Sequence, residues 1–263
     1  MSTALDRGLS LIERLSGQPE GMTLCALADE LLIPRSACHR LLAELHQRGY
    51  VRQPQDQGPY VLTTKLASLG LSFLSSAGIV DIAEPLLERL ARESGELVRL
   101  SVVDGERLTW VAKVQGSRKG LRYDPDMGND ARLSCTASGH AWLLTLSDER
   151  ALELVARQGF GAPKDYGPRA PTTLKALLGF LHAARTRGYA MIDEVFAPGM
   201  AAVAVPVLRR SEAVGVISIA GPRSRLTPER MHALAAPMLQ AAAELGPMWR
   251  SSTLFGRPPL GKA

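Results

Sequence analysis

The sequence predicts an α+β protein of two domains, on three observations. A chain of 263 residues is long for a single hydrophobic core. Its N-terminal part holds three short amphipathic helical patterns and a hairpin with a polar tip, whereas after Gly78 two apolar hairpins alternate with helical segments. We expect domains at residues 1–63 and 79–248, joined by a helix over residues 64–78 and followed by a disordered tail over residues 249–263.

The N-terminal domain is expected to contain three helices and a hairpin. The first helix has an apolar stripe at Leu5, Leu9, Ile12 and Leu15. Thr23 suits the N-cap of the second helix, LCALADEL. The third begins at Pro34, where a missing N–H costs least, and ends at Gly49. Residues 50–52 and 60–62 read as strands around QPQDQGP. This order is that of a winged helix-turn-helix.

The third helix has two different faces. Its apolar stripe is formed by Cys38, Leu41, Leu42 and Leu45, and its polar flank by Arg35, Ser36, His39 and Arg40. A recognition helix places its first turns in the major groove, where Arg reads guanine and Ser or His contacts a base edge or phosphate. We therefore predict that this flank reads double-stranded DNA. Arg52, the wing at residues 55–58 and Thr23 would hold phosphates. A solvated polar face is the alternative for this helix taken alone.

Net charge is not the evidence for this prediction. The chain carries a formal charge of +5, but residues 1–78 contain seven basic and seven acidic side chains. The excess lies in the C-terminal part, so only the concentration of positive groups around residues 35–52 favours a nucleic acid.

The C-terminal domain is expected to be one antiparallel sheet with helices around it. Hairpins are predicted over LVRLSVVDGERLTWVAKV and over AAVAVPVLRRSEAVGVISIAG. Helices are predicted over IAEPLLERLARESG, from Thr136, over residues 148–157 and 173–187, and from Pro228 to about Leu245. Pro206 cannot donate to a ladder, which predicts an edge strand or a bulge there.

The cysteines and the N-terminus indicate the compartment. Cys25, Cys38 and Cys135 are odd in number and lie far apart without a CxxC pair, which indicates reduced thiols and no zinc site. The first residues lack the pattern of a secretory signal, and no apolar run approaches the ~18 residues that span a bilayer. We expect a cytoplasmic protein that uses no membrane, metal or cofactor.

An enzyme is the remote alternative. Cys135 and His140 lie five residues apart and could form a nucleophile and its base. The pair lacks a third orienting group, and the chain has no GxSxG, Walker A or HExxH motif. We therefore assign no catalytic residue.

Several ordered motifs carry a resemblance to a known family. They are ALDRGLSLIERLSGQPEGMTLCALADELLIPRSACHRLLAELHQRGYV, then KLASLG, RLSCTASGHAWL, RTRGYAMIDEVFAPGMAAVAVPV and GVISIAGPRSRLT. Over residues 4–246 the chain resembles the IclR-type transcriptional regulators. The resemblance implies a winged-helix domain, a linker helix and a GAF-like effector domain, in homodimers or tetramers on operator DNA. It implies a ligand-responsive regulator, a repressor of catabolic genes, whose effector is a small aromatic or carboxylate metabolite.

The resemblance also implies an effector pocket. Its residues would be Ala137, Ser138, Ile192, Asp193, Ala202, Ser218 and Ala220. Ile192 stands where such regulators with small hydrophilic effectors commonly have an acid, Ala202 where they often have cysteine, and His140 where lysine is usual. With Ile192 and Ala202 at these positions the pocket is less polar, which favours an aromatic or otherwise apolar ligand over a two- or three-carbon acid, unless Asp193 turns inward. The alternative is a C-terminal domain that only oligomerises.

Overall fold

The computed structural model describes residues 3–55, 57–124 and 127–249. The chain divides into two units, Met1–Ser76 and Ala77–Ala263. Residues 250–263 of the predicted tail lie outside the described residues. Trp249, which the prediction placed in that tail, is instead buried, because its ring lies against Gly215 in the core.

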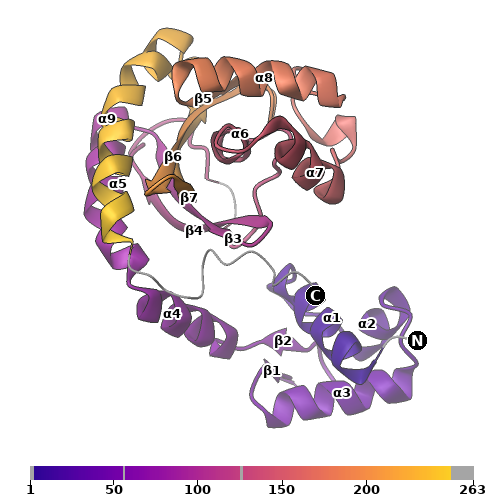
Figure 1. The fold of residues 1–263 in the computed structure, drawn as a ribbon. Coiled ribbons are helices and arrows are strands. Elements are labelled where there is room, and N and C mark those ends of the chain that lie inside the picture. The colour runs from indigo at the N-terminus through magenta and orange to yellow at the C-terminus, as the bar shows by residue number, and fades with distance from the viewer. Residues whose placement is uncertain (1–2, 56, 125–126, 250–263) are drawn as a thin grey trace, which may run out of the picture. The chain divides into compact units, whose positions relative to one another are not determined.

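The N-terminal unit is built of helices and one small hairpin (Figure 1). Its elements are α1 (Ala4–Ser16), α2 (Leu24–Glu30), α3 (Arg35–Gln47), β1 (Val51–Arg52), β2 (Val61–Leu62) and α4 (Lys65–Ala77). Buried apolar side chains of α1, α2 and α3 form one core with Val51 and Tyr60 of the hairpin. The apolar stripes predicted from the sequence therefore pack against one another.

Local chemistry sets the boundaries of α3. Pro34 is the N-cap residue and not the first helical residue as predicted, because its ψ of 134° is extended while its carbonyl accepts the first helical hydrogen bond from Cys38. The helix ends at Gln47, and the chain turns at Gly49, whose φ of +75° favours glycine. Strand β1 follows directly.

The C-terminal unit is a five-stranded antiparallel sheet between two layers of helices. The strand order is β4-β3-β7-β6-β5. Strand bounds are β3 (Leu97–Asp104), β4 (Arg107–Gln115), β5 (Ala190–Asp193), β6 (Met200–Arg209) and β7 (Glu212–Pro222). The helices are α5 (Ile79–Ser94), α6 (Ala137–Leu143), α7 (Asp148–Gln158), η1 (Pro163–Asp165), α8 (Leu174–Arg187) and α9 (Pro228–Met248).

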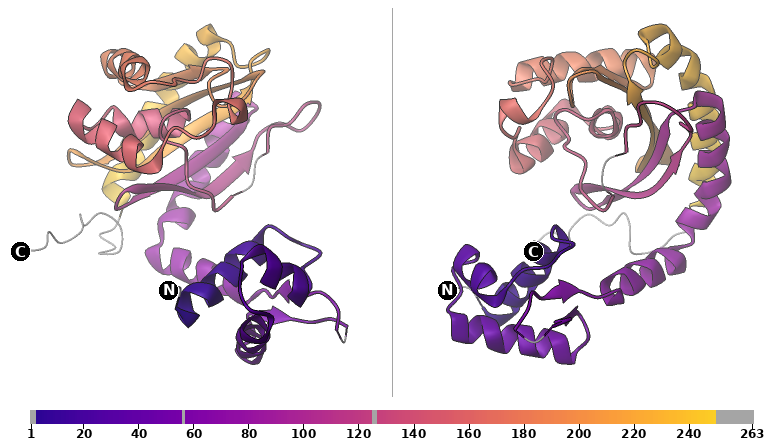
Figure 2. Two further views of the ribbon diagram at one scale, coloured as in Figure 1. Left: turned by 90° about the vertical axis from the view of Figure 1, so that its right-hand side faces the viewer. Right: turned by 180° about the vertical axis from the view of Figure 1, so that it is seen from behind.

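The two faces of the sheet have separate cores. Helices α5 and α9 lie side by side on one face (Figure 2), where an Arg89–Glu244 ion pair links them. Helices α6, α7 and α8 cover the other face. Because side chains alternate along a strand, each strand contributes to both cores.

The structure corrects three details of the predicted C-terminal domain. Strand β5 was not predicted, because only four residues pair with β6. Helix α9 continues three residues beyond the predicted Leu245. Pro206 lies on an inner strand and not on an edge strand, but β5 begins opposite Ala204, so Pro206 pairs only with Val216 of β7. The bulge that was predicted as the other possibility lies next to it, as a register shift between Val207 and Leu208. The inner strand thus lacks its second neighbour at the proline.

Over the described part of the chain, no single helix is both long and apolar enough to cross a bilayer. Only Lys65–Ser75 and Ile79–Ser94 counted together reach that length and composition.

Candidate functional site

The polar flank of α3 forms a continuous exposed face. Ser36, His39, Arg40, Ala43 and Gln47 are all exposed, and their spacing places them on one side of the helix. Cys38 and Leu42, on the opposite side, are fully buried. The buried stripe therefore holds α3 on the domain and leaves its polar side open.

The predicted DNA-reading side chains differ in their partners. Among the described residues, Arg40 and His39 form no ion pair or side-chain hydrogen bond. Arg35 forms an exposed ion pair with Asp29 of α2, with Nη2 3.3 Å from Oδ2. An exposed pair of this kind contributes less than about 1 kcal/mol to stability, so a DNA phosphate could take the place of the Asp29 carboxylate. Thr23 caps α2, because its hydroxyl accepts a hydrogen bond from the Ala26 N–H at 3.2 Å.

Strand β1, which carries Arg52, contacts α3 within the same unit, and Asp56 of the predicted wing lies outside the described residues. Arg52 is exposed on β1, opposite Val61. The Gln53 amide donates to the Gly58 carbonyl at 2.8 Å, and this bond braces the wing. Lys65, which sequence reasoning did not single out, donates from Nζ to the Arg48 carbonyl at 2.5 Å and lies over the Tyr50 ring. It joins the start of α4 to the end of α3.

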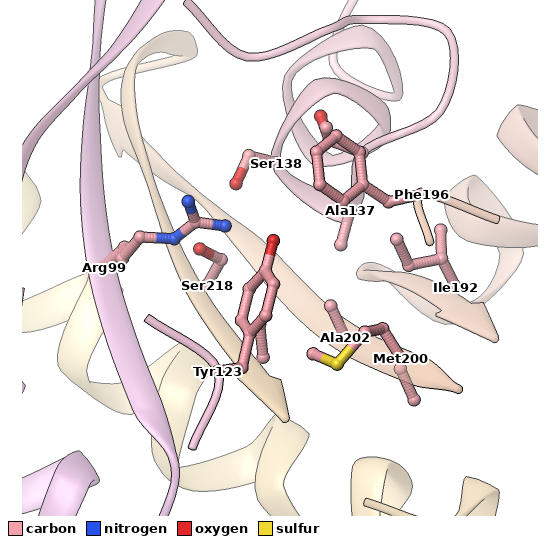
Figure 3. A pocket seen from close by; sticks show the side chains of 12 residues that line it. Arg99, Tyr123, Ala137, Ser138, Ile192, Phe196, Met200, Ala202 and Ser218 are labelled. Carbon is pink, nitrogen blue, oxygen red and sulfur yellow. The ribbon is translucent and has the colours of Figure 1, made fainter. Parts of the chain in front are cut away.

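A cavity opens between α6 and the sheet of the C-terminal unit (Figure 3). Its residues are Arg99, Tyr123, Thr136, Ala137, Ser138, Ile192, Phe196, Met200, Ala201, Ala202, Ser218 and Ala220. It encloses about 350 Å³ with its mouth included, but the inner part between the side chains is narrow. The cavity is therefore a narrow gap lined by polar and apolar side chains, and a bound molecule would have to widen it.

Strand register brings the floor of this cavity together. Arg99 of β3 is paired with Ser218 of β7, and Ala220 of β7 is paired with Ala202 of β6, which in turn is paired with Ile192 of β5. Paired residues point to the same face of a sheet. The cavity floor is therefore polar at Arg99 and Ser218 and apolar toward β5.

Six of the seven residues that sequence reasoning placed in a pocket line this cavity; the exception is Asp193. Asp193 does not line this cavity, and arginines from distant segments pair with its carboxylate. Arg223 Nε lies 3.2 Å from Oδ1, and Arg169 pairs with Oδ2. Neither arginine was predicted to lie near Asp193.

Besides Thr136 and Ala201, which adjoin predicted residues in the chain, sequence reasoning missed four cavity residues: Arg99, Tyr123, Phe196 and Met200. One of them had a signal in the sequence: Arg99 interrupts the apolar run LVRLSVV, and a charged residue inside a buried strand is unusual. The other three come from loops or a strand end, where periodicity carries no information.

Comparison with known proteins identifies the two units. The family model of the IclR helix-turn-helix domain matches residues 4–55, and that of the bacterial transcriptional regulator IclR C-terminal domain matches residues 71–246. The second match alone covers more than half of the chain.

The chain belongs to the IclR family of transcriptional regulators.

Individual relatives agree with this IclR-family assignment. The transcriptional repressor IclR of Escherichia coli (strain K12) is 32% identical over 245 residues, which cover 92% of this chain and 88% of that protein. The acetate operon repressor of Salmonella typhimurium (strain LT2) matches to the same extent. In fold, the chain is similar to an IclR homologue from Microbacterium hydrocarbonoxydans crystallised with 4-hydroxybenzoate. That likeness has a TM-score of 0.78 at 19% identity and covers 95% of this chain and 100% of that one.

These IclR-family relatives are regulators and not enzymes. The chemistry of Cys135 and His140 agrees with this. Burial raises the pKa of the Cys135 thiol to about 12, so the thiol is protonated at neutral pH. Burial lowers the pKa of His140 to about 4, and its Nε2 lies 2.8 Å from the Ser134 carbonyl, to which a neutral imidazole donates. His140 thus holds the turn before α6, and a protonated Cys135 thiol beside a neutral imidazole of low pKa is not an activated nucleophile and base.

The buried His140 makes stability depend on pH. Its pKa is about 4 in the folded protein and 6.5 in the absence of burial, so between these values the unfolded state binds more protons and stability falls as pH falls. We expect protonation linked to this residue to lower the free energy of unfolding by about 2 kcal/mol between pH 7 and pH 5. Urea unfolding of the protein and of His140→Gln at both pH values measures it. Equal losses in the two proteins would contradict the assignment.

Proposed function

We propose that this IclR-family regulator is a ligand-responsive repressor whose α3 reads operator DNA and whose C-terminal cavity binds a small-molecule effector. The observation that carries the proposal is the exposed polar face of α3 opposite its buried stripe. The relatives named as repressors support the direction of control. The relative named for an acetate operon supports control of catabolic genes.

In the proposed complex, α3 enters the major groove by its N-terminal half. Arg40 has two donors for a guanine edge, and Ser36 and His39 reach neighbouring bases or phosphates. Arg52 and the wing hold the backbone, as do Thr23 and the first N–H groups of α2. Arg35 exchanges its exposed pair with Asp29 for a phosphate.

The effector is proposed to be a small aromatic or carboxylate metabolite. The cavity supports this because it combines polar groups at Arg99 and Ser218 with an apolar side at Ile192 and Ala202. The homologue crystallised with 4-hydroxybenzoate is consistent with such a ligand in this fold. Bound effector would shift the populations of DNA-binding arrangements through α4.

We also propose that the regulator acts as a homodimer or tetramer. Leu5 and Leu9 of α1 and Leu69 and Leu71 of α4 are large apolar side chains that are at least half exposed. Exposed apolar side chains of this kind suit contact with a second copy. Two copies would place two α3 helices on successive major grooves of a palindromic operator.

The alternative, a C-terminal domain that only oligomerises, predicts an unbroken core beside Ser138 and Ser218. Both residues line the cavity instead, so the observation favours a ligand-binding domain.

Binding to the DNA upstream of the protein's own gene tests the proposal. A repressor of this kind forms a sequence-specific complex, roughly 1,000-fold or more tighter than that with unrelated duplex, and its affinity falls steeply with salt. Gel shift over a salt series, with unrelated duplex as competitor, gives both quantities. Equal affinity for the upstream DNA and the unrelated duplex would contradict the proposal.

A further inference from the structure

Arg99 is a charged side chain in the middle of a buried strand. It lies on β3 with 6% of its surface exposed, and its neighbours Val98 and Leu100 are fully buried. Its guanidinium carbon lies 4.0 Å from the centre of the Trp110 ring and 5.9 Å from that of Tyr123. The two aromatic side chains thus position the guanidinium, and Figure 3 shows it beside Tyr123 at the cavity.

The charge of Arg99 lacks a partner of opposite sign. No carboxylate of the described residues forms an ion pair with it, and its Nε and Nη1 atoms are buried without a hydrogen-bond acceptor. Burial lowers the pKa of Arg99, an effect that the neighbouring Tyr123 phenol only partly offsets. A buried and unpaired charge is costly, so proteins that retain one commonly use it.

A second polar group faces the same space. Ser218 is the register partner of Arg99 on β7, and its hydroxyl is also buried without a hydrogen-bond partner. Figure 3 shows Ser138 of α6 and Ser218 both directed toward the Arg99 guanidinium. Within this cluster of the described residues, donors therefore outnumber acceptors.

The opposite end of the cavity is apolar. Ile192, Phe196, Met200 and Ala202 line it, and it carries no charged side chain among the cavity residues that the structure describes. A second charged group on a ligand would meet these side chains and lose its hydration without compensation.

We propose that Arg99 is the anion anchor of this cavity and selects a monocarboxylate with an apolar body as ligand. The inference rests on the proposed function and names the ligand class of its effector site. The carboxylate accepts hydrogen bonds from Arg99 and Ser218, with Ser138 beside them, and the body of the ligand lies against Ile192, Phe196 and Met200. Because the inner cavity is narrow, a ring-sized body requires the half-buried side chains of Phe196 and Met200 to move apart.

Ligand-induced stabilisation of the full chain tests this assignment. The probes are benzoate, its neutral isostere benzamide, the small acid acetate and the diacid terephthalate, each at millimolar concentration. Benzoate is expected to raise the melting temperature, and the other three to have little effect. Titration calorimetry should show benzoate binding roughly 10- to 100-fold more weakly in Arg99→Met, because hydrogen bonds to a charged group are lost. Arg99→Lys, which keeps the charge, should recover part of the affinity.

Two controls separate an anchor from a structural residue. Arg92→Met removes one positive charge from α5, on the other face of the sheet, and should leave benzoate binding unchanged. Unliganded Arg99→Met should melt at the same temperature as the wild type or higher, because the variant no longer buries an unpaired charge.

Several results would contradict the assignment of Arg99 as anchor or of the apolar end as the site of the ligand body. Benzamide acting as well as benzoate, an undiminished response in Arg99→Met, or no response to any acid would overturn the anchor. Acetate or terephthalate acting as well as benzoate would overturn the apolar body. None of these results depends on DNA, so a regulator that failed to bind its upstream DNA would refute the proposed function separately.

Discussion

Replacing Arg40 with alanine is expected to weaken operator binding by about 1–3 kcal/mol, or about 5- to 150-fold. Arg40 is exposed on the polar face of α3, and among the described residues it has no ion pair or side-chain hydrogen bond. Its guanidinium is therefore available to a guanine edge, and its removal leaves the buried stripe of α3 untouched. The folded structure should not change.

The same experiment distinguishes base reading from backbone contact. Arg40→Ala should lose discrimination between operator and unrelated duplex, whereas Arg52→Ala should weaken both complexes alike and reduce the salt slope by about one. Arg92→Ala, which removes the same charge from α5 of the other unit, serves as the control. Fluorescence anisotropy over a salt series measures all three. Normal operator binding by Arg40→Ala would show that α3 is not placed as proposed.

Replacing Gly139 with alanine is expected to destabilise the C-terminal unit by about 3 kcal/mol. A Cβ at this position would lie 2.6 Å from both the Cα and the carbonyl oxygen of Leu133, which are backbone atoms that cannot rotate away. Leu133 is itself held, because its N–H donates to the Gln158 side chain at 2.8 Å. Helix α6 would have to move, and Ala137 and Ser138 of the cavity would move with it.

Gly179 provides the matched control for this substitution. It lies in the interior of α8, and an added Cβ would meet no atom within 4 Å. Gly179→Ala should therefore stabilise the protein by about 0.5–1 kcal/mol, because alanine favours the helix and restricts the unfolded chain. Urea unfolding at neutral pH compares the two variants. A Gly139→Ala protein as stable as the wild type would mean that α6 does not pack this closely on Leu133.

Local patterns predicted the elements around the α3 face. The stripe of Cys38 and Leu42, the cap at Thr23 and the stop at Gly49 all act within one or two turns of helix, so their effect can be read along the chain. The predicted start of α3 was one residue early, because proline is tolerated both at the N-cap and as the first residue of a helix, and the sequence does not distinguish the two positions. The exposure of Arg40 followed from the same periodicity.

The cavity was predicted only where family motifs covered it. Six of its residues were named from the CTASGHA, YAMIDE, GMAAVAVPV and VISIAG motifs. Arg99 was not, because its importance depends on Ser218, which lies more than a hundred residues away and becomes its neighbour only through the β3–β7 register. The ion pairs of Asp193 could not be predicted for a similar reason, since Arg169 and Arg223 reach it from distant segments.

By itself, the sequence determined the helices, the three hairpins and the polar flank of α3, because hydrophobic period, caps and turns act between residues close in the chain. Only the tertiary structure decided which charges are paired. Pairing depends on distances between segments that strand register and helix packing bring together, and those distances leave Asp193 neutralised and Arg99 without a counter-ion among the described residues.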